Sequence, residues 1–478
     1  MIGVQDRQQE EMFVVGPLSS FIPEDHILKR VNKVLDLSWL RTEVKELYCT
    51  TNGRPGIDPE AAVRLMIAGF FQGITHDRKL MREAQVNLAI RWFAGYQLHQ
   101  KLPDHSSLTR IRQRWGVERF KAIFQRTVQM CVDAGLVDGE TVHIDATLIR
   151  ADVSWKSITE RHVEKVLQDN SDGDDPEPKR RGPKRKNPPK SDKRSTTDPD
   201  ATLTTSSHDF HMEPSYKQHG AVDDRCCVIV DVDITTGQQN EGEQLPEQIE
   251  RIEVNTGRKI KALTADAGYA HGTNYELLEK KDIDAIIPPQ RRGSRSSNIP
   301  LSRFKYDEKN NIVKCPQGKT MRPSSENEQG MIYRASSCDC RKCSLNDKCT
   351  SGRKGSRTVL IGKGYSALLR ARRRALCTDH EFARLYERHR IKSEGMHGEA
   401  KTQHGLRRAV RRGLANVAIQ AYLTAIVINL KHLVTFGGGS WHITGVTMTI
   451  QMRYGTTEVQ IGLICRINNG NYCQRLAA

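Results

Sequence analysis

The chain has 478 residues, of which 37% are hydrophobic and 27% are charged, and its formal net charge is +17. At about 150 residues per domain, this length predicts three domains. No run approaches the roughly 18 consecutive apolar residues of a membrane-spanning helix, and the N-terminus lacks the pattern of a secretion signal. The excess of Lys and Arg in such a chain indicates nucleic acid as the partner, with a basic tail on an ordinary enzyme as the alternative.

The first 137 residues are predicted to form an all-helical domain. Asp58 and Pro59 make a strong helix start, because an acidic N-cap precedes a proline at the first helical position. A second start near residue 104 leads into a basic helix that carries Arg110, Arg112 and Arg114. We interpret this as a DNA-contacting helix of the helix-turn-helix kind, with a solvated basic face as the alternative.

The periodicity changes at residue 141 from helical to strand-like. Val142 and Ile144 alternate with His143 and Asp145, which predicts a strand. Further strands are predicted at 228–234, 261–266 and 284–288, separated by helices at 245–254 and 273–281. This order of elements predicts a mixed α/β domain.

Three segments interrupt or follow this domain. We expect residues 156–207 to form a disordered basic loop, because they are rich in proline and charge and have almost nothing to bury. Residues 291–375 are basic, polar and rich in cysteine, which predicts an insertion. The helical tract that follows contains the most apolar helix, at 418–433, which we expect in the core, and the tail at 437–478 has no predicted place in the fold.

Two aspartates are candidate catalytic residues. Asp145 lies in the first strand and Asp266 ends a later one, so both are expected outside the strand ends, where open α/β sheets bind ligands. Three carboxylates from separate elements suffice to hold two divalent cations roughly 4 Å apart. Such a pair activates a water or 3′-hydroxyl and stabilises the leaving oxygen of a phosphodiester, and Mg²⁺ prefers these hard oxygen ligands.

The third acid is expected on the helix near residue 390. At about 100° per residue, Arg390, Glu394 and Lys401 fall within roughly 40° of one another. Glu399 lies roughly 140° from Glu394 and points elsewhere. A metal ligand flanked by phosphate-binding cations fits this face, and an exposed salt-bridge stripe is the alternative.

With these motifs the chain resembles the DDE transposases of bacterial insertion sequences, whose last acid lies in a Tyr-Arg-Glu-Lys signature written Y-x2-R-x3-E-x6-K. The spacing from Arg390 through Glu394 to Lys401 fits this signature fully, whereas Tyr386 precedes Arg390 by three intervening residues instead of two. HIDATLIRAD resembles the first-Asp motif and TADAGYAHGTNYELL the second. The likeness spans about residues 20–435.

The resemblance implies an RNase H-like core in which Asp145, Asp266 and Glu394 converge on Mg²⁺, with Mn²⁺ as a substitute. It implies strand cleavage at the ends of the insertion sequence and transfer of those ends to target DNA. Arg390 and Lys401 would then hold phosphates near the scissile bond. A further basic cluster would lie on the DNA path: Arg407, Arg408, Arg411 and Arg412. The implied setting is a homodimer on double-stranded DNA in the bacterial cytoplasm, associated with the nucleoid and not with a membrane.

The cysteine-rich insertion contains four candidate zinc ligands: Cys315, Cys340, Cys343 and Cys349. In a reducing compartment such clustering favours metal ligation over disulfides. Four thiolates make a closed tetrahedral structural site. Cys338 is an alternative fourth ligand, and reduced thiols without a metal are the alternative to zinc.

The predicted organisation combines these parts. A helical DNA-binding domain at 1–137 precedes an RNase H-like core at 138–290 and 376–436, which the insertion at 291–375 divides. The leading function is a Mg²⁺-dependent DNA transposase. A catalytically inactive DNA-binding relic is the main alternative, because the tail resembles read-through beyond a lost stop, although all three acids are present. An RNase H-like nuclease acting on RNA–DNA hybrids or junctions is the third.

Overall fold

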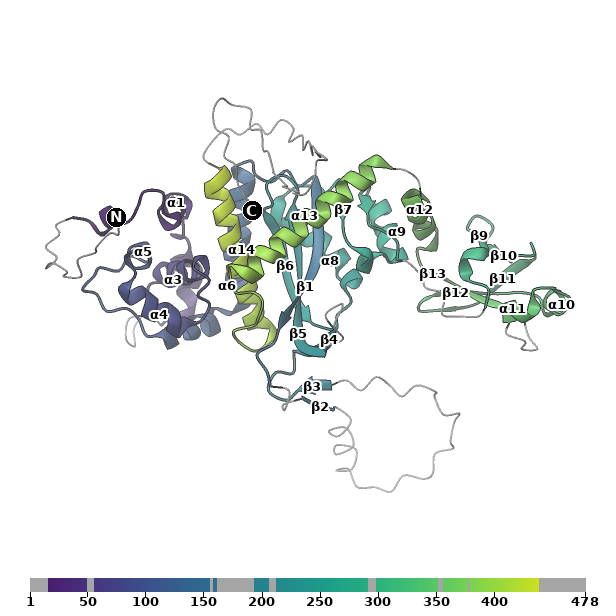
Figure 1. Ribbon diagram of the computed structural model, residues 1–478, viewed down its shortest axis with the longest axis horizontal. Coiled ribbons are helices and arrows are strands. Elements are labelled where there is room, and N and C mark those ends of the chain that lie inside the picture. Colours follow the sequence, from purple (N-terminus) through teal and green to yellow (C-terminus); the bar gives the residue numbers. More distant parts are fainter. Residues whose placement is uncertain are drawn as a thin grey trace, which may run out of the picture.

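The computed structural model describes residues 16–49, 56–154, 158–160, 193–205, 212–290, 298–350, 356–376 and 379–437 (Figure 1). The basic stretch at 161–192 and the tail beyond residue 437 lie outside the described residues. The expectations for those two segments therefore stay predictions.

The N-terminal part is helical, as predicted. Its elements are η1 (Leu18–Phe21), α1 (Ile27–Val34), α2 (Leu40–Val44), η2 (Lys45–Leu47), α3 (Pro59–Phe71), α4 (Asp77–Val86), α5 (Leu88–Phe93) and α6 (His105–Asp133). Asp58 caps α3 by accepting a hydrogen bond from the Glu60 amide, and Asp104 caps α6 in the same way. Gly116 interrupts α6 with φ of 71°, so the basic helix is kinked where it leaves the N-terminal helices.

The central sheet has eight strands. They are β1 (Thr141–Arg150), β2 (Ile158–Glu160), β3 (Lys193–Ser195), β4 (Thr202–Thr205), β5 (Met212–Asp223), β6 (Ile229–Thr236), β7 (Ala262–Thr264) and β8 (Asp284–Ile286). The order is β2-β3-β4-β5-β1-β7-β8, with β6 also paired to β5. β1, β7 and β8 are parallel, while β5 runs antiparallel to β1, β4 and β6.

The expectation of a disordered loop over 156–207 is wrong for its two ends. β2, β3 and β4 lie inside that range and pair in antiparallel fashion, and β4 continues the pairing onto β5. The physical reason is the long β5 strand, whose first residues offer an edge to which the Thr-rich segment Thr202–Thr205 can pair. Proline and charge content did not reveal that edge.

Four helices complete the α/β part. They are α8 (Leu245–Thr256), α9 (Gly272–Lys280), α13 (His380–Thr402) and α14 (Leu414–Phe436), with short turns η4 (Glu241–Glu243) and η5 (Ala267–Tyr269). α13 crosses β1, β5, β7 and β8 (Figure 1), while α14 packs against β6 and α6 and also touches α1 and α3. α14 therefore joins the N-terminal helices to the sheet.

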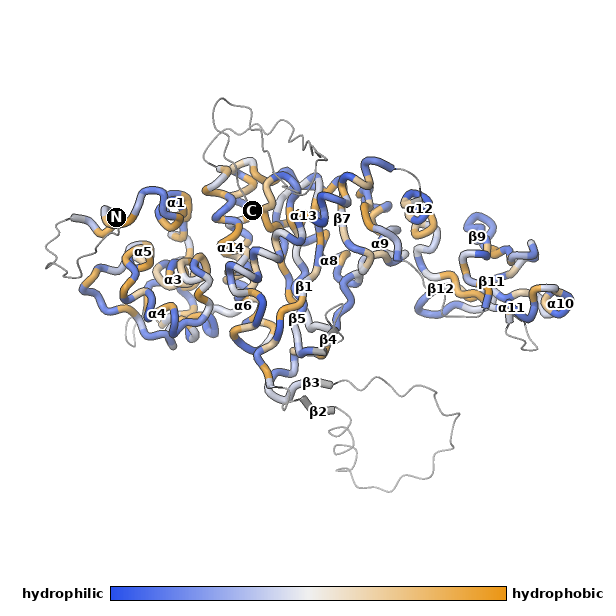
Figure 2. Tube along the Cα trace, viewed as in Figure 1, coloured by the Kyte–Doolittle hydropathy of each residue, from blue (hydrophilic) through white to orange (hydrophobic). Residues whose placement is uncertain are grey.

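α14 is the most apolar helix in the described part of the chain, and hydrophobic residues run along it in Figure 2. By length and composition it could cross a membrane, but 78% of its most apolar window is buried inside the protein. That burial is what a core helix needs. The prediction of a core helix here is confirmed.

The cysteine-rich segment forms a second sheet of its own. Its strands are β9 (Lys305–Asp307), β10 (Ile312–Lys314), β11 (Thr320–Asn327), β12 (Gly330–Arg334) and β13 (Thr358–Gly362), antiparallel in the order β13-β12-β11-β10-β9. The turn η6 (Leu301–Arg303) precedes this sheet, and α10 (Ser337–Arg341) and α11 (Asn346–Thr350) follow β12. α12 (Tyr365–Leu376) then packs on α9 and returns the chain to the central sheet.

Candidate active site

The register of the two central parallel strands brings the two predicted aspartates together. β1 pairs with β7 as far as His143 and Thr264. Asp145 and Asp266 each lie two residues beyond that pair, so Asp145 shares a sheet face with His143. We had expected Asp145 at the end of its strand, and this is wrong. β1 continues along β5 to Arg150, so Asp145 lies within the strand. β7 stops at Thr264, and we call the place beyond the pair of β1 and β7, where Asp145 and Asp266 lie, the acidic opening.

Negative charge accumulates at this opening. The pKa of Asp145 is raised to about 7: burial is the main cause, the charges of Asp266, Glu241 and Glu394 add to it, and a hydrogen bond from the next backbone amide opposes the rise. Burial and then Glu241 also raise the pKa of Asp266, whose carboxylate accepts a 2.8 Å hydrogen bond from the Gly268 amide. Without a cation, the site holds carboxylates that are costly to ionise together.

The third predicted acid lies on α13 above this pair. Glu394 is close enough for its charge to contribute to the raised pKa of Asp145. Its side chain is 68% exposed and forms an ion pair with Arg390, with Nε and Oε1 3.2 Å apart. To bind the same metal ion as Asp145, the Glu394 side chain must therefore turn away from Arg390. Its exposure leaves it free to do so.

The other signature positions also surround the aspartates. Burial raises the pKa of Tyr386, and the charges of Asp266 and Asp145 add to that rise, so its phenol lies near both despite the irregular spacing. Lys401 is partly buried: burial and Arg407 lower its pKa, and the charge of Asp145 opposes them. Tyr386, Glu394 and Lys401 of α13 therefore lie within electrostatic range of Asp145.

Glu399 points away from the aspartates, as the helix geometry predicts. Lys431 of α14 donates a 2.8 Å hydrogen bond to its Oε1, and His404 Nε2 lies 3.5 Å from the same oxygen. Together His404 and Lys431 lower the pKa of Glu399 to about 2. This carboxylate fastens α13 to α14.

A buried polar chain behind the aspartates escaped the sequence analysis. His143 Nε2 lies 2.9 Å from Asp224 Oδ1, and its Nδ1 lies 2.7 Å from Thr264 Oγ1. Thr264 Oγ1 lies 2.9 Å from Nδ1 of His389, which is on α13. The available signal was position, since His143 and Thr264 each stand two residues before a candidate aspartate.

His397 is a second residue that sequence reasoning missed. It lies three residues after Glu394 on α13, and its Nε2 is 3.6 Å from Asp145 Oδ2. Burial, followed by the charges of Lys401 and His389, lowers its pKa to about 3, so the ring is neutral and forms no ion pair. Neither ring nitrogen has a hydrogen-bond partner among the described residues.

Glu241 and Tyr269 also face this opening and were not predicted. Glu241, at the start of η4, pairs with Lys217 of β5, with Nζ and Oε1 2.9 Å apart. Tyr269 is fully buried, and its hydroxyl has no hydrogen-bond partner among the described residues. Burial raises the pKa of Tyr269 well above its usual value, and the charges of Glu241, Asp145 and Asp266 add to this.

The donor set suits a hard divalent cation. As their side chains stand, no three His, Cys, Asp or Glu residues within the described ranges are grouped closely enough to hold a metal. Carboxylate oxygens are nevertheless the ligands that Mg²⁺ and Mn²⁺ prefer. Burial and neighbouring carboxylates raise the pKa of both Asp145 and Asp266, and a bound cation would favour their ionised forms.

One predicted DNA-contacting residue of α6 is wrongly assigned. Arg112 is only 3% exposed and donates two 2.8 Å hydrogen bonds to the two oxygens of Asp77 on α4. Two residues along a helix are about 200° apart, so Arg112 faces inward between its exposed neighbours Arg110 and Arg114. Arg114 lies over the ring of Tyr48, 4.7 Å from its centroid. Arg110 and Arg114 thus remain available to DNA, and Arg112 does not.

The basic cluster after α13 is likewise divided. Arg407, Arg408 and Arg412 are exposed. Arg408 forms a 2.9 Å ion pair with Asp152, and Arg412 donates a hydrogen bond to the carbonyl of the same residue. Arg411 forms a 2.6 Å ion pair with the buried Asp77. Its guanidinium therefore neutralises a buried carboxylate, and its assignment to DNA contact is wrong. Two arginines thus converge on one buried acid.

The four candidate zinc ligands lie near one another on the turns and short helices beside the second sheet. Burial raises the pKa of the Cys349 thiol, Arg357 opposes this, and Cys340, Cys343 and Cys315 lie close enough to add to the rise. Leu345 donates its amide to Cys343 Sγ at 3.4 Å, and Cys338 is exposed. The described cysteines are free thiols, and no three of them stand within reach of one ion.

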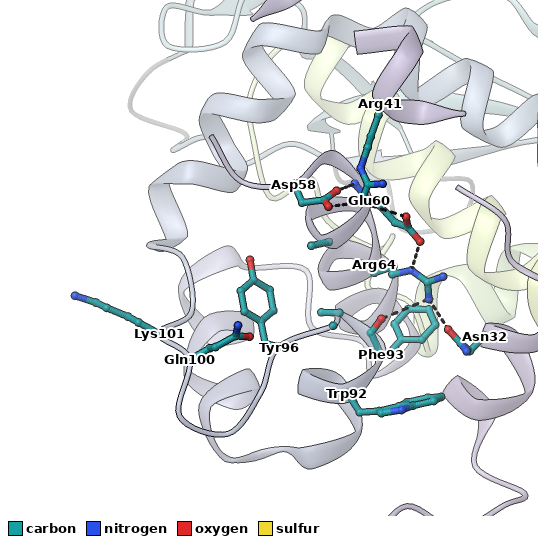
Figure 3. A pocket seen from close by; sticks show the side chains of 13 residues that line it. Asn32, Arg41, Asp58, Glu60, Arg64, Trp92, Phe93, Tyr96, Gln100 and Lys101 are labelled. Atoms are coloured by element: carbon teal, nitrogen blue, oxygen red, sulfur yellow. Dashed lines mark hydrogen bonds and ion pairs between the residues drawn. The ribbon is translucent and has the colours of Figure 1, made fainter. Parts of the chain in front are cut away.

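A cavity of about 720 Å³ lies among the N-terminal helices (Figure 3). Asp145 and Asp266 are not among the residues that line it. Its arginines are neutralised: Arg41 pairs with Asp58, and Arg64 Nε lies 3.0 Å from Glu60 Oε1. Because these charges are paired internally, the cavity is a poor phosphate site.

Two family models match the chain. Residues 17–114 match a transposase domain (DUF772), and residues 314–434 match a transposase DDE domain, which includes Cys315 and Glu394. Asp145 and Asp266 lie between the two matches. No curated protein matches the chain.

Solved structures with some likeness include transposase complexes. A piggyBac transposase synaptic complex with hairpin DNA is 9% identical, over 87% of this chain and 76% of that chain, with a TM-score of 0.32. A pre-cleavage Mos1 transpososome is 11% identical, over 52% of this chain and 65% of that chain, with a TM-score of 0.16. Likenesses this low carry no argument about the site, so the family assignment rests on the two domain models.

Proposed function

Since the chain belongs to the DDE transposases, we propose that its acidic opening cleaves DNA at the ends of an insertion sequence and joins them to target DNA. Asp145, Asp266 and Glu394 are the proposed catalytic and metal-binding residues. The observation that carries this proposal is the register of β1 with β7, which sets both aspartates two residues beyond one strand pair, beneath the signature face of α13.

The proposed core is RNase H-like and spans 138–290 and 376–436. The strand order β6-β5-β1-β7-β8, antiparallel on one side and parallel on the other, supports this assignment. The helices up to residue 137 form the proposed DNA-binding domain. The second sheet, within 291–375, forms the proposed insertion, in which four thiolates hold one structural zinc ion: Cys315, Cys340, Cys343 and Cys349.

The proposed cofactor is Mg²⁺, for which Mn²⁺ substitutes. When bound, two divalent cations make a water or a 3′-hydroxyl nucleophilic and stabilise the leaving oxygen. Asp145 releases its proton, and Glu394 turns from Arg390 toward the two aspartates. Arg390 is then free to hold a DNA phosphate beside the scissile bond, with Lys401 on the opposite side of Glu394 along α13.

The proposed DNA path follows exposed cations and open backbone. Arg110, Arg114, Arg407, Arg408 and Arg412 contact phosphates in this proposal. Gly398 lies on the same side of α13 as Glu394, and nothing lies within 4 Å of the position a Cβ would take there. A duplex can therefore approach this face closely. A homodimer in the bacterial cytoplasm, at the nucleoid, would hold two ends at once.

The test is cleavage and strand transfer on DNA that carries the ends of the element, with Mg²⁺ present. We expect Asp266→Asn to abolish both reactions while end binding, followed by electrophoretic mobility shift, stays within about twofold. Cleavage by the Asp266→Asn protein at the normal rate would refute the proposed site. An unsubstituted chain that binds ends but never cleaves would indicate the inactive relic.

A further inference from the structure

A turn that joins β6 to α8 brings a fourth carboxylate to the acidic opening. This turn, η4, is fastened to η5 by Asn274, whose side-chain amide donates to the carbonyls of Gly242 and Tyr269 at 2.8 and 3.0 Å. Asn274 is buried, so this bridge is shielded from water. Glu241 and Asp266, at the starts of the two turns, are thereby held side by side.

The space around Gly268 shows how close the two carboxylates are. A Cβ on Gly268 would lie 2.8 Å from Oε2 of Glu241 and 2.9 Å from Oδ1 of Asp266. The two oxygens therefore face the same small volume, and the absence of a side chain at Gly268 leaves that volume open.

The orientation of Glu241 is set from the other side by β5. Lys217 holds Oε1 of Glu241 at 2.9 Å and also donates a 2.9 Å hydrogen bond to the carbonyl of Gln239. One carboxylate oxygen is thus committed to Lys217, while the second is turned to Asp266.

An independent observation marks the same volume as a ligand site. The Tyr269 hydroxyl is fully buried and has no hydrogen-bond partner among the described residues, although it lies within the field of Glu241, Asp145 and Asp266. Leaving a buried hydroxyl without a partner costs about 1–3 kcal/mol. A water bound to a cation in this volume would supply the missing partner by donating a hydrogen bond to the Tyr269 hydroxyl oxygen.

We propose that Glu241 is a fourth carboxylate of the catalytic site, which binds the divalent cation next to Asp266 directly or through one water, while Lys217 holds it in position. This inference rests on the proposed function, because it concerns the cation assigned there to Asp145, Asp266 and Glu394. It adds a ligand that lies outside the three-acid signature.

In the experiment, the full chain is titrated with Mn²⁺ in the absence of DNA. The electron paramagnetic resonance signal of free Mn²⁺ measures how much of the ion is bound. We expect Glu241→Gln to weaken Mn²⁺ binding about 10- to 100-fold, the range seen when supporting groups of a metal site are removed. Glu243→Gln is the matched control: Glu243 is exposed on the same turn, and its partner is Gln239. It should bind Mn²⁺ like the unsubstituted protein. Equal Mn²⁺ affinity for Glu241→Gln and Glu243→Gln would overturn the proposal.

A second variant separates metal binding from a structural salt bridge. Lys217→Met removes the same ion pair but keeps the Glu241 carboxylate, so it should lose much less Mn²⁺ affinity than Glu241→Gln. If Glu241 served only the fold, the two variants would shift Mn²⁺ affinity and thermal stability alike, and the proposal would fail.

Failure of this inference can be told from failure of the proposed function. If Asp266→Asn abolishes cleavage while Glu241→Gln binds Mn²⁺ normally, only the fourth carboxylate is refuted. If Asp266→Asn leaves both cleavage and Mn²⁺ affinity unchanged, the three-acid site itself is refuted, and the fourth ligand with it.

Discussion

Thr264 Oγ1 and His389 Nδ1 are hydrogen-bonded at 2.9 Å. Thr264 lies two residues before Asp266, and His389 lies five residues before Glu394. The direction of this bond follows from the rest of the chain of contacts. An ionised Asp224 can only accept, so His143 donates from Nε2, and in its neutral form the ring accepts the Thr264 proton at Nδ1. Thr264 then has only a lone pair for His389, whose Nδ1 must carry the proton.

This chain fastens α13 to the two strands that carry the aspartates. His389 also stacks on Tyr386 at 5.7 Å between ring centroids, which orients the tyrosine toward the site. Because the three buried partners come from β1, β7 and α13, they fix the position of the helix along the sheet. The position of Glu394 along the sheet therefore depends on residues outside the proposed three-acid site.

The first prediction tests this placement. Thr264→Val keeps the shape of the side chain but leaves two imidazole nitrogens without their partner, so we expect a loss of about 1–3 kcal/mol in the free energy of unfolding. Cleavage should fall about tenfold or more, because Glu394 is no longer held in place. Thr264→Ser restores the hydroxyl and should recover most of both losses. Urea denaturation and single-turnover cleavage check the two effects, and a serine variant as impaired as the valine one would contradict the argument.

The second prediction separates two glutamates on one helix. Glu394→Gln should abolish cleavage and leave folding intact, because its side chain is mostly exposed and its ion pair is with the likewise exposed Arg390. Glu399→Gln should retain cleavage but lower the melting temperature, because it loses the charge that Lys431 and His404 hold. We expect a loss of about 1–2 kcal/mol for that change. Normal cleavage by the Glu394→Gln protein would refute its role as the third ligand.

The third prediction concerns pH. Because the pKa of Asp145 is raised to about 7 in the metal-free protein, the folded state holds a proton that the unfolded chain releases near pH 4. The proton on Asp145 therefore stabilises the folded state. This stabilisation is fully present below pH 4 and is lost as the pH rises through 7. Asp145→Asn should flatten that dependence in thermal melts recorded without metal.

Metal binding should depend on the same proton of Asp145, but Mn²⁺ affinity should rise with pH where the stability of the metal-free protein falls. Below pH 7, a cation must displace the proton of Asp145, so Mn²⁺ affinity should rise about tenfold per pH unit from 5 to 7 and then level off. Calorimetry in buffers of different ionisation enthalpy counts the released protons. Binding without proton release at pH 6 would show that Asp145 is already ionised.

The fourth prediction contrasts two arginines of α6. Arg112→Ala leaves Asp77 buried with one fewer partner, and we expect a loss of about 3–5 kcal/mol in stability. Arg110→Ala should leave stability within about 0.5 kcal/mol. It should instead weaken DNA binding and reduce the slope of log affinity against log salt by about one. Equal thermal stability of the two variants would contradict the buried pairing of Arg112.

The fifth prediction concerns the cysteines of the second sheet. The purified chain should contain one zinc ion by elemental analysis, and Cys343→Ser should lose it. Chelation should then unfold the second sheet, detected as faster proteolysis near residue 345, while the central sheet remains folded. Cys338→Ser is the control, because Cys338 is exposed and is not among the three thiols whose charges act on Cys349. A chain that is stable and free of zinc would refute the assignment.

The sequence by itself was sufficient for the types of most elements and for the face of α13. Strand alternation around Asp145, capping at Asp58 and the angular spacing of Glu394 and Glu399 are local properties, determined by residues a few positions apart. Local periodicity therefore predicted which way each side chain points along its own element.

Only the tertiary structure decided which of those side chains meet. The pairing of β1 with β7 joins His143 to Thr264 across 121 residues, and the turn at Glu241 reaches the site through Asn274. The burial of Arg112 against Asp77 likewise depends on how α4 packs on α6. Register and packing sum weak contacts over the whole chain, so no local pattern encodes them, and they determine where charge is buried and where a cation is needed.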